Sequence, residues 1–541
     1  MPLDMLVTGR IATFAGASGF GWVEAVGVRD GVVAFAGSAV DLESRADPHT
    51  RRIELEPGEL AMPGIIDAHL HLTGAALAAE QVDLTPAQSI DEALALLAAA
   101  ARDVPAPGWI LGGGWDQRRF GAWPNAAALE RNVPGRLVAL RAFDHHAAWV
   151  SRAALAVAGI DRDTADPDGG VISRDADGEP DGVLLENAGG MVLNLVPAPD
   201  DDVVRRAIRS YGQTLLRLGV VGAHDPARLS SDPENRAFDL YAELAEADEL
   251  PIRIRACVRA EGLENAIGRG LRSGGAIGAA DRSRLSFGWL KLFADGTLGS
   301  KTAALLDPIE GSSDRGLFLS PPERLAELAS QAADAGIATM IHAIGDAGCR
   351  AALDALAPTA ARVPFMPRVE HVQLLGTADR SRFATHGIAA SVQPVHLRED
   401  AETARRDWGP RAESNGYTWR SLLDAGATLA FGTDAPVEPA DPWPGIALAV
   451  LRRDPSWGPD AEPYGPDQGL TLEEALRAAT VGVAATARDP LGGRLIPGSL
   501  ADLIVLPAAP RESADPAERA GAFAEVRPRL VMVGGEVAIE R

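Results

Sequence analysis

Ala338-Thr339-Met340-Ile341-His342 is the stretch from which the fold can be argued, because it is an apolar run that ends in a polar residue. A helical pattern follows it at residues 346–356. A buried strand followed by a helix is typical of βα units and of a parallel sheet. The stretch therefore predicts one βα unit with a histidine at the carboxyl end of its strand.

Similar runs recur along the middle of the chain, at residues 368–372, 389–393 and 427–434. Each carries a polar residue at its carboxyl end, which is where barrel enzymes place their catalytic groups. A chain of 541 residues is too long for one ordinary core. We therefore expect a large α/β domain of barrel size and at least one smaller companion.

The two ends of the chain contain short β-like runs instead, in the first 60 residues and again beyond residue 500. We expect them to pair into one composite β-sandwich, made of residues 1–60 and 490–541, beside a barrel made of residues 61–489. The stretch at about 81–202 is longer than one βα unit and rich in Gly, Pro, Trp and Asp. We interpret it as an insertion that shapes the pocket.

The composition limits the classes of partner. A formal charge of −24 and a pI near 4.9 argue against nucleic acid and against an anionic membrane surface, since both need clustered cations. Two cysteines give neither a disulfide framework nor a paired CxxC zinc motif. No signal sequence and no apolar run of membrane-spanning length is found. We expect a cytoplasmic enzyme with a small-molecule substrate; the oligomeric state stays open, with a homodimer as one option.

Lys291 stands out because the chain holds 51 basic residues and only Lys291 and Lys301 are lysines. A coding bias that replaces lysine with arginine almost everywhere should spare lysine where an amine is required. The reason is that arginine cannot lose its proton in a protein, whereas a buried lysine can. Lys291 lies in an apolar run at residues 285–296, closed by a turn signal. We expect it on a strand buried on both faces.

Histidines mark the same end of other predicted strands. Residues 62–71 form an apolar strand that ends in His-x-His, and residues two apart on a strand point the same way, so both imidazoles can reach one metal ion. Imidazole suits zinc and similar divalent metals. The six candidate ligands, expected at one rim of the barrel, are His69, His71, Lys291, His342, His371 and Asp434.

A carbamylated Lys291 would complete this arrangement, because the anionic carbamate can bridge two cations. His69, His71 and Asp434 would then hold one ion. His342 and His371 would hold the other. A water or hydroxide between the metals would be acidic enough to attack at neutral pH.

With these residues the chain resembles the amidohydrolase superfamily. The matching stretches are PGIIDAHLH at 63–71, LKLFADG at 290–296, HAIGD at 342–346, EH at 370–371, FGTDAP at 431–436 and PGSLADL at 497–503. GGGWD at 112–116 and DHH at 144–146 make it similar to the amidohydrolase-3 branch, which includes N-substituted formamide deformylases. The resemblance implies a distorted (β/α)8 TIM barrel with a flanking β-sandwich from both termini, and one or two metal ions.

The resemblance also implies the reaction. The purine and pyrimidine deaminases of the superfamily carry a His-x-x-Glu motif after the fifth strand. Residues 342–345 read HAIG and lack that Glu, so hydrolysis of an amide-type C–N bond is favoured over deamination. Asp434 would accept the proton of the attacking hydroxide and deliver it to the departing amine. His146 resembles a pocket histidine that steadies an oxyanion, although an ordinary loop histidine is the alternative.

Four further residues are candidates for substrate binding: Trp115, Asp116, His224 and His396. Packing is the alternative for Trp115, since a Gly-rich loop with Trp also packs for structural reasons, and His224 could support a ligand instead of touching substrate. A lactonase or esterase is the first rival function, because the same hydroxide attacks esters. A non-catalytic scaffold is the second, and its usual mark is a missing ligand; none of the six is missing.

Overall fold

The chain forms two compact units, one of residues 1–75 and 208–541 and the other of residues 76–207. The predicted insertion at 81–202 lies inside the second unit. In the computed structural model the described residues are 2–102, 104, 106–143, 147–227, 234–458, 460–507, 522 and 525–541.

The first unit contains a nearly closed barrel of eight strands, each parallel to its neighbour. At the closing point Ala68 N–H donates to Phe431 O at 2.9 Å. This confirms the predicted α/β barrel. The strands are β6 (Ile65–Asp67), β13 (Val220–Asp225), β14 (Arg253–Arg259), β15 (Leu285–Phe293), β16 (Ala338–Ala343), β17 (Arg368–His371), β18 (Ala389–Val392) and β19 (Leu429–Phe431).

The barrel strands are short apolar runs that are buried on both faces, as parallel strands covered by helices must be. Every residue of β16, β17, β18 and β19 is buried.

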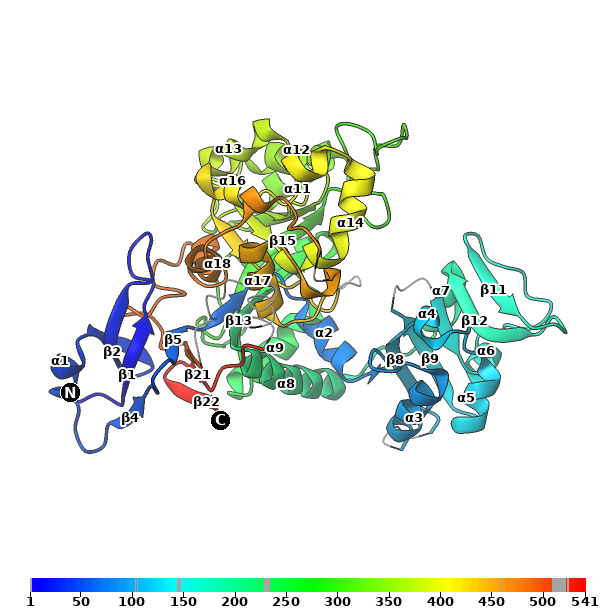
Figure 1. Ribbon diagram of the computed structural model, residues 1–541, viewed down its shortest axis with the longest axis horizontal. Helices are drawn as coiled ribbons and strands as arrows, with labels where there is room; N and C mark the ends of the chain where they lie inside the picture. The colour runs from blue at the N-terminus through cyan, green and yellow to red at the C-terminus, as the bar shows by residue number, and fades with distance from the viewer. Residues whose placement is uncertain are drawn as a thin grey trace. The chain divides into compact units, whose positions relative to one another are not determined.

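Helices lie around the outside of the barrel (Figure 1). In α11 (Pro322–Asp334) the buried residues Leu325, Leu328, Ala329 and Ala332 follow the spacing of one helix face. The other helices of this unit are α1 (Ala39–Glu43), α2 (Leu72–Ala79), α8 (Asp201–Leu218), α9 (Arg236–Glu246), α10 (Leu263–Gly268), α12 (Asp346–Leu356), α13 (Thr377–His386), α14 (Leu397–Trp408), α15 (Arg411–Asn415), α16 (Trp419–Asp424), α17 (Pro442–Leu451), α18 (Leu472–Ala478) and α19 (Val481–Thr486). The boundaries between the two units fall within the sequences of α2 and α8.

A second sheet joins the two ends of the chain. β5 pairs antiparallel with β20, with Ala61 opposite Val505. The sheet has the order β22-β21-β20-β5-β1-β2-β3, with β4 beside β1. Its strands are β1 (Met5–Ala12), β2 (Trp22–Arg29), β3 (Val32–Gly37), β4 (Arg51–Glu54), β5 (Leu60–Pro63), β20 (Leu503–Leu506), β21 (Leu530–Val533) and β22 (Glu536–Glu540).

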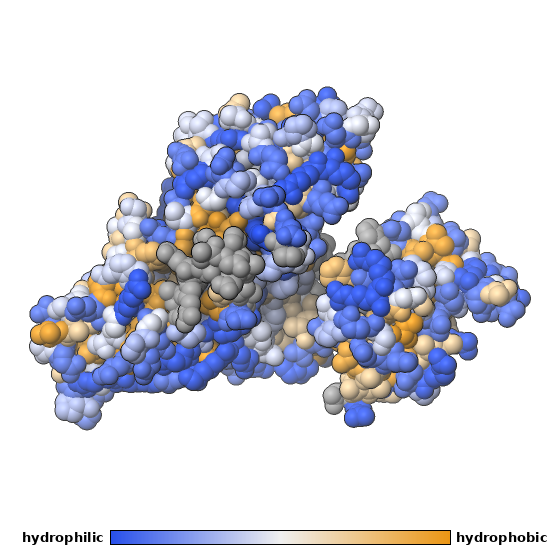
Figure 2. Space-filling model, viewed as in Figure 1, coloured by the Kyte–Doolittle hydropathy of each residue, from blue (hydrophilic) through white to orange (hydrophobic). Residues whose placement is uncertain are grey.

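Gly64 alone separates β5 of this sheet from β6 of the barrel. A Cβ at Gly64 would lie 2.4 Å from Cγ1 of Val221 on β13, so the close crossing requires glycine. Hydrophilic side chains cover most of the barrel surface seen in Figure 2. Among the described residues, no helix is long and apolar enough to cross a membrane.

The unit of residues 76–207 has its own six-stranded sheet, in the order β11-β12-β10-β9-β8-β7. The predicted Gly-rich loop at 112–114 is wrong, because these glycines lie in β8 (Trp109–Trp115). A Cβ at Gly112 would lie 2.5 Å from Val82 O, so glycine permits the close approach of the strands. The remaining elements are β7 (Val82–Asp83), β9 (Leu137–Ala142), β10 (Ala147–Val150), β11 (Gly170–Arg174), β12 (Pro180–Glu186), α3 (Ile90–Ala100), α4 (Gln117–Phe120), α5 (Ala126–Asn132), α6 (Arg152–Val157) and α7 (Asn187–Leu193).

Candidate metal centre

His69 and His71 follow strand β6, which ends at Asp67, so the prediction that they lie on the strand itself is wrong. The Asp67 carboxylate ends the strand by taking up backbone N–H groups, as Asp side chains commonly do. Its Oδ1 accepts the N–H of His69 at 2.9 Å and that of Thr433 at 3.1 Å, and its Oδ2 accepts the Thr433 hydroxyl at 2.6 Å. Asp67 therefore ties the segment after β6 to the segment after β19.

Asp434 lies on that second segment and faces the two histidines. Its N–H donates to His69 O at 2.7 Å, and its backbone φ is +61°. Its Oδ1 lies 3.3 Å from His71 Nε2 and 3.5 Å from His69 Nε2. Burial alone would raise the pKa of Asp434, but the neighbouring histidines, His69 foremost, hold it well below its usual value. Asp434 is therefore an ionised carboxylate in a buried place.

The hydrogen-bond partners of three imidazoles decide which nitrogen of each ring carries the proton. A carboxylate, a backbone carbonyl and an amide oxygen only accept, so each Nδ1 that binds one must carry the proton and each Nε2 presents a lone pair. The contacts are His69 Nδ1 to Glu370 Oε2 at 2.7 Å, His71 Nδ1 to Ala227 O at 2.8 Å and His371 Nδ1 to Gln393 Oε1 at 2.7 Å. These three rings are oriented as metal ligands usually are.

His342 is held the other way round. Its Nε2 lies 3.0 Å from Gly296 O, so that nitrogen carries the proton and Nδ1 holds the lone pair. The ring is nevertheless part of the cluster, because its centroid lies 4.4 Å from that of His371. The ring of His371 lies 5.1 Å from that of His69.

The tightest group of possible ligand atoms belongs to His69, His371 and Asp434, which lie within 4.8 Å of one another. The sequence analysis assigned His69 and Asp434 to one ion and His371 to a second, whereas here all three lie together. The division of the ligands between two ions stays a prediction. Burial lowers the pKa of His69 to about 4 and that of His342 to about 3, and it lowers the pKa of His371 well below the usual value. At neutral pH all three rings are uncharged and can bind a metal.

Lys291 lies on β15, as predicted, and its side chain is buried. Within the described part of the chain its Nζ has no hydrogen-bond partner. Its Nζ lies 4.9 Å from the centroid of the Phe293 ring. Burial lowers the pKa of Lys291 to about 8, although the carboxylates of Glu370 and Asp434 act in the opposite direction. A buried amine without a partner is costly, so this position is suited to a lysine that binds or carries a further group.

Behind His69 lies an ion pair that the sequence analysis missed. Arg368 Nε is 3.0 Å from Glu370 Oε1, and both side chains are fully buried. Burial would raise the pKa of Glu370, but Arg368 and His69 lower it to about 2. Arg368 also donates to His224 Nδ1 at 2.9 Å. The sequence feature that could have revealed this ion pair is Arg-x-Glu at 368–370 inside a buried strand. Residues two apart on a strand point to the same face, so the two charges lie side by side.

His396 lies on the other side of Asp434, with Nε2 3.4 Å from its Oδ2. Burial would lower the pKa of His396, but the Asp434 carboxylate raises it above the usual value. The two oxygens of Asp434 thus face different partners, Oδ2 towards His396 and Oδ1 towards His69 and His71. His396 therefore lies beside the candidate metal centre. The predicted contact between His396 and substrate stays a prediction.

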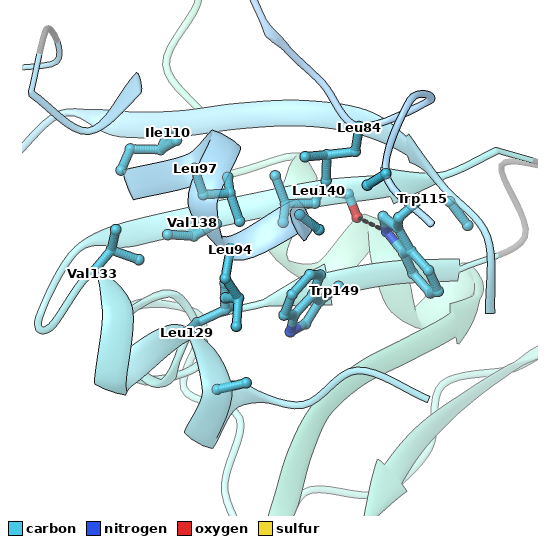
Figure 3. Close-up of a cluster of buried hydrophobic side chains, with 14 of the residues drawn as sticks. Leu84, Leu94, Leu97, Ile110, Trp115, Leu129, Val133, Val138, Leu140 and Trp149 are labelled. Carbon is cyan, nitrogen blue, oxygen red and sulfur yellow. Dashed lines mark hydrogen bonds between the residues drawn. The ribbon is translucent and has the colours of Figure 1, made fainter. Parts of the chain in front are cut away.

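Trp115 and Asp116 belong to the unit of residues 76–207. Figure 3 shows Trp115 within a buried cluster, with its Nε1–H donating to Leu140 O at 3.0 Å. Asp116 accepts the N–H of Arg118 at 2.8 Å and so caps helix α4. A contact between either residue and substrate stays a prediction. His146 lies outside the described residues.

The donor set at this centre fits a divalent metal ion. Imidazoles with oriented lone pairs, one ionised carboxylate and an amine for which the described residues offer no partner converge within the barrel. This is the mixture of nitrogen and oxygen ligands that zinc and similar ions take. The ends of β6, β15, β16, β17 and β19 supply these residues. This is the rim at which barrel enzymes carry their chemistry.

Comparison with known proteins identifies the family. The model of the amidohydrolase family matches residues 57–539. The chain belongs to the amidohydrolase family. The resemblance stated from the sequence motifs is therefore confirmed, and with it a hydrolase of the metal-dependent type.

Relatives within the family match over almost the whole chain. The YtcJ protein of Bacillus subtilis is 32% identical over 500 residues, covering 92% of each chain. The N-substituted formamide deformylase of Arthrobacter pascens is 27% identical over 543 residues, covering 96% of this chain and 95% of its own. The structure of an uncharacterized metal-dependent hydrolase from Pyrococcus horikoshii superimposes with a TM-score of 0.77 at 26% identity, covering 96% of this chain and 99% of that one.

Proposed function

We propose that this amidohydrolase cleaves an amide-type C–N bond of a small N-formyl or N-acyl amine. The observation that carries the proposal is the cluster of His69, His371 and Asp434 beside the unpartnered amine of Lys291. The similarity to a formamide deformylase over almost the whole chain supports the choice of substrate class. Lactones and esters remain the rival substrates.

We propose zinc as the metal and the six predicted residues as its ligands. Lys291 would act as a carbamate: the neutral amine attacks carbon dioxide, an N–C bond forms, and one proton leaves to solvent. The resulting anion would give the buried Nζ region the partners that it lacks. The bound metal would polarise the substrate carbonyl and lower the pKa of a water molecule.

The roles of the protein side chains follow from their contacts. The Asp434 carboxylate is ionised and buried, so it can take the proton of the attacking water and pass it to the amine nitrogen as the C–N bond breaks. Glu370 holds the His69 ring in one orientation and one tautomer. His396, at Oδ2 of Asp434, is placed to contact the substrate or the departing group.

Other predicted roles remain proposals. His146 would steady the oxyanion, and Trp115 and Asp116 would contact substrate. His224 is better suited to support the residues behind the metal ligands than to contact substrate, because its Nδ1 accepts a hydrogen bond from the buried Arg368. We also propose a cytoplasmic enzyme whose partner is a small molecule, with a homodimer as the assembly to test.

Paired substrates test the function. N-Formylbenzylamine and benzyl formate share their acyl group and ring and differ in the atom that leaves. Purified zinc-loaded protein should release formate from the amide, and the Asp434→Asn variant should not. Turnover of the ester alone would contradict the proposal and favour the esterase.

A further inference from the structure

A large cavity lies in the first unit at the opposite end of the barrel from the histidine cluster. Its volume is about 590 Å³, which is within the range of small-molecule sites. The starts of β6, β13, β14 and β15 form one wall, and the segment that runs from α19 to β20 forms the other. The cavity therefore lies beside the segments that join the barrel to the terminal sheet. Its lining includes His224 but none of the six candidate metal ligands.

Five arginines and three aspartates line this cavity, although the chain as a whole carries a net charge of −24. Three of the arginines have structural partners. Arg253 pairs with both carboxylate oxygens of Asp502 at 2.6 and 2.9 Å, Arg488 donates to Ala360 O at 3.1 Å, and Arg494 donates to Phe14 O and to Gly16 O.

Arg255 on β14 is less well compensated. In the described part of the chain its guanidinium donates one hydrogen bond, to Ser286 Oγ at 3.3 Å, and its closest carboxylate is that of Asp489 at 3.8 Å. Burial lowers the pKa of Arg255, yet a guanidinium keeps its proton in proteins. The cavity wall thus holds a positive charge with several N–H groups left to donate.

Ser286 provides a second donor beside it. The residue is 2% exposed, and its Oγ accepts from Arg255. Among the described residues no acceptor takes the hydroxyl proton, which a ligand oxygen could therefore accept. A guanidinium and a hydroxyl side by side match the oxygens of a carboxylate or a phosphate.

The cavity also has room for an apolar body. Its volume corresponds to roughly 20 water molecules at about 30 Å³ each, far more than an inorganic ion fills. Phe365, Leu491 and Leu500 line it, and both leucines are more than one third exposed. Apolar lining with a few convergent polar groups is typical of organic ligand sites.

We propose that this cavity is a second binding site, for an organic anion whose carboxylate or phosphate is held by Arg255 and Ser286 and whose apolar part contacts Phe365, Leu491 and Leu500. Such a ligand would stabilise the junction between the barrel and the terminal sheet, because it binds the folded state alone. The site is independent of the proposed hydrolysis.

Titration calorimetry with benzoate, phenyl phosphate and the neutral benzamide tests the proposal on the full-length protein. We expect at least one anion to bind about tenfold more tightly than benzamide. The preferred anion identifies the head group. Binding should persist in the Asp434→Asn variant, which separates this site from the metal centre.

Arg255→Met should weaken the binding of that anion about tenfold or more, and the control Arg324→Met, which removes an exposed arginine of α11, should not. If Arg255→Met does not fold, Leu491→Trp tests the same cavity by filling it and should likewise weaken binding about tenfold or more. No binding of either anion, equal binding of benzamide, or unchanged affinity in these cavity variants would overturn the proposal.

Discussion

Glu370 Oε2 accepts a hydrogen bond from His69 Nδ1 at 2.7 Å, and both side chains are almost fully buried. The carboxylate fixes the tautomer of His69, so that Nε2 presents its lone pair towards Asp434. Arg368 in turn keeps Glu370 ionised. The orientation of a candidate metal ligand therefore depends on a buried pair of charges one layer behind it.

Replacing Glu370 by Gln should weaken zinc binding about tenfold to a hundredfold. The amide oxygen still accepts from His69, so the shape is kept, but the negative charge that makes the imidazole more basic is lost. Competition with a zinc-sensitive dye measures the affinity. Glu327→Gln, at an exposed position of α11, is the control, and an unchanged affinity in Glu370→Gln would contradict the argument.

Removing Arg368 should destabilise the fold. Arg368→Met leaves the Glu370 carboxylate buried without its cation, which costs about 3–5 kcal/mol in proteins. Urea unfolding measures the loss, and the double variant Arg368→Met/Glu370→Gln should recover part of it because no buried anion then remains. A loss below about 1 kcal/mol in the single variant would show that the pair is not needed.

Loading of the metal centre should depend on pH through Lys291. The amine with a pKa of about 8 is neutral above that pH, and only the neutral form reacts with carbon dioxide. From about pH 7 to about pH 9 the neutral fraction rises from roughly a tenth to roughly nine-tenths. His69 and His342, with pKa values of about 4 and 3, stay neutral throughout.

Metal-free protein given zinc and a fixed concentration of dissolved carbon dioxide should therefore regain activity several-fold faster at the higher pH. Lys291→Arg should show no response to carbon dioxide. A reactivation rate that falls as the pH rises would contradict a carbamate at Lys291.

Gly432 should tolerate no side chain. A Cβ there would lie 2.5 Å from the backbone N of His69 and 2.9 Å from Oδ1 of Asp67, so Gly432→Ala should push the segment after β19 away from the metal centre. We expect a loss of about 1–3 kcal/mol in the free energy of unfolding and a lower zinc content. Gly268→Ala is the control, since no described atom outside the adjoining part of its own helix α10 lies within 4 Å of its Cβ position. Equal stability of the two variants would contradict the packing argument.

Local patterns in the sequence were sufficient for the barrel. Continuous apolar runs followed by helical spacing predict strands such as β15 and β16, because a strand covered on both faces has little room for polar side chains. The same logic places Lys291 on its strand and His342 near the carboxyl end of the next.

Contacts between segments far apart in the chain could not be predicted from such local patterns. Asp67 ends β6 by binding Thr433, 366 residues away, and so leaves His69 and His71 beyond the strand. Gly112 lies in a strand because Val82 approaches it closely, whereas a glycine run by itself favours a loop. The cavity at Arg255 likewise depends on segments that meet only in the folded chain.

Metal content and turnover, measured on the same preparation before and after chelation, test the metal centre most directly. We expect the purified protein to hold one or two divalent ions, to lose both the metal and the hydrolysis of N-formylbenzylamine on chelation, and to regain both with zinc. The His69→Ala/His371→Ala variant should fold and hold less metal. Full turnover by the metal-free protein would contradict a metal-dependent hydrolase built on His69, His371 and Asp434.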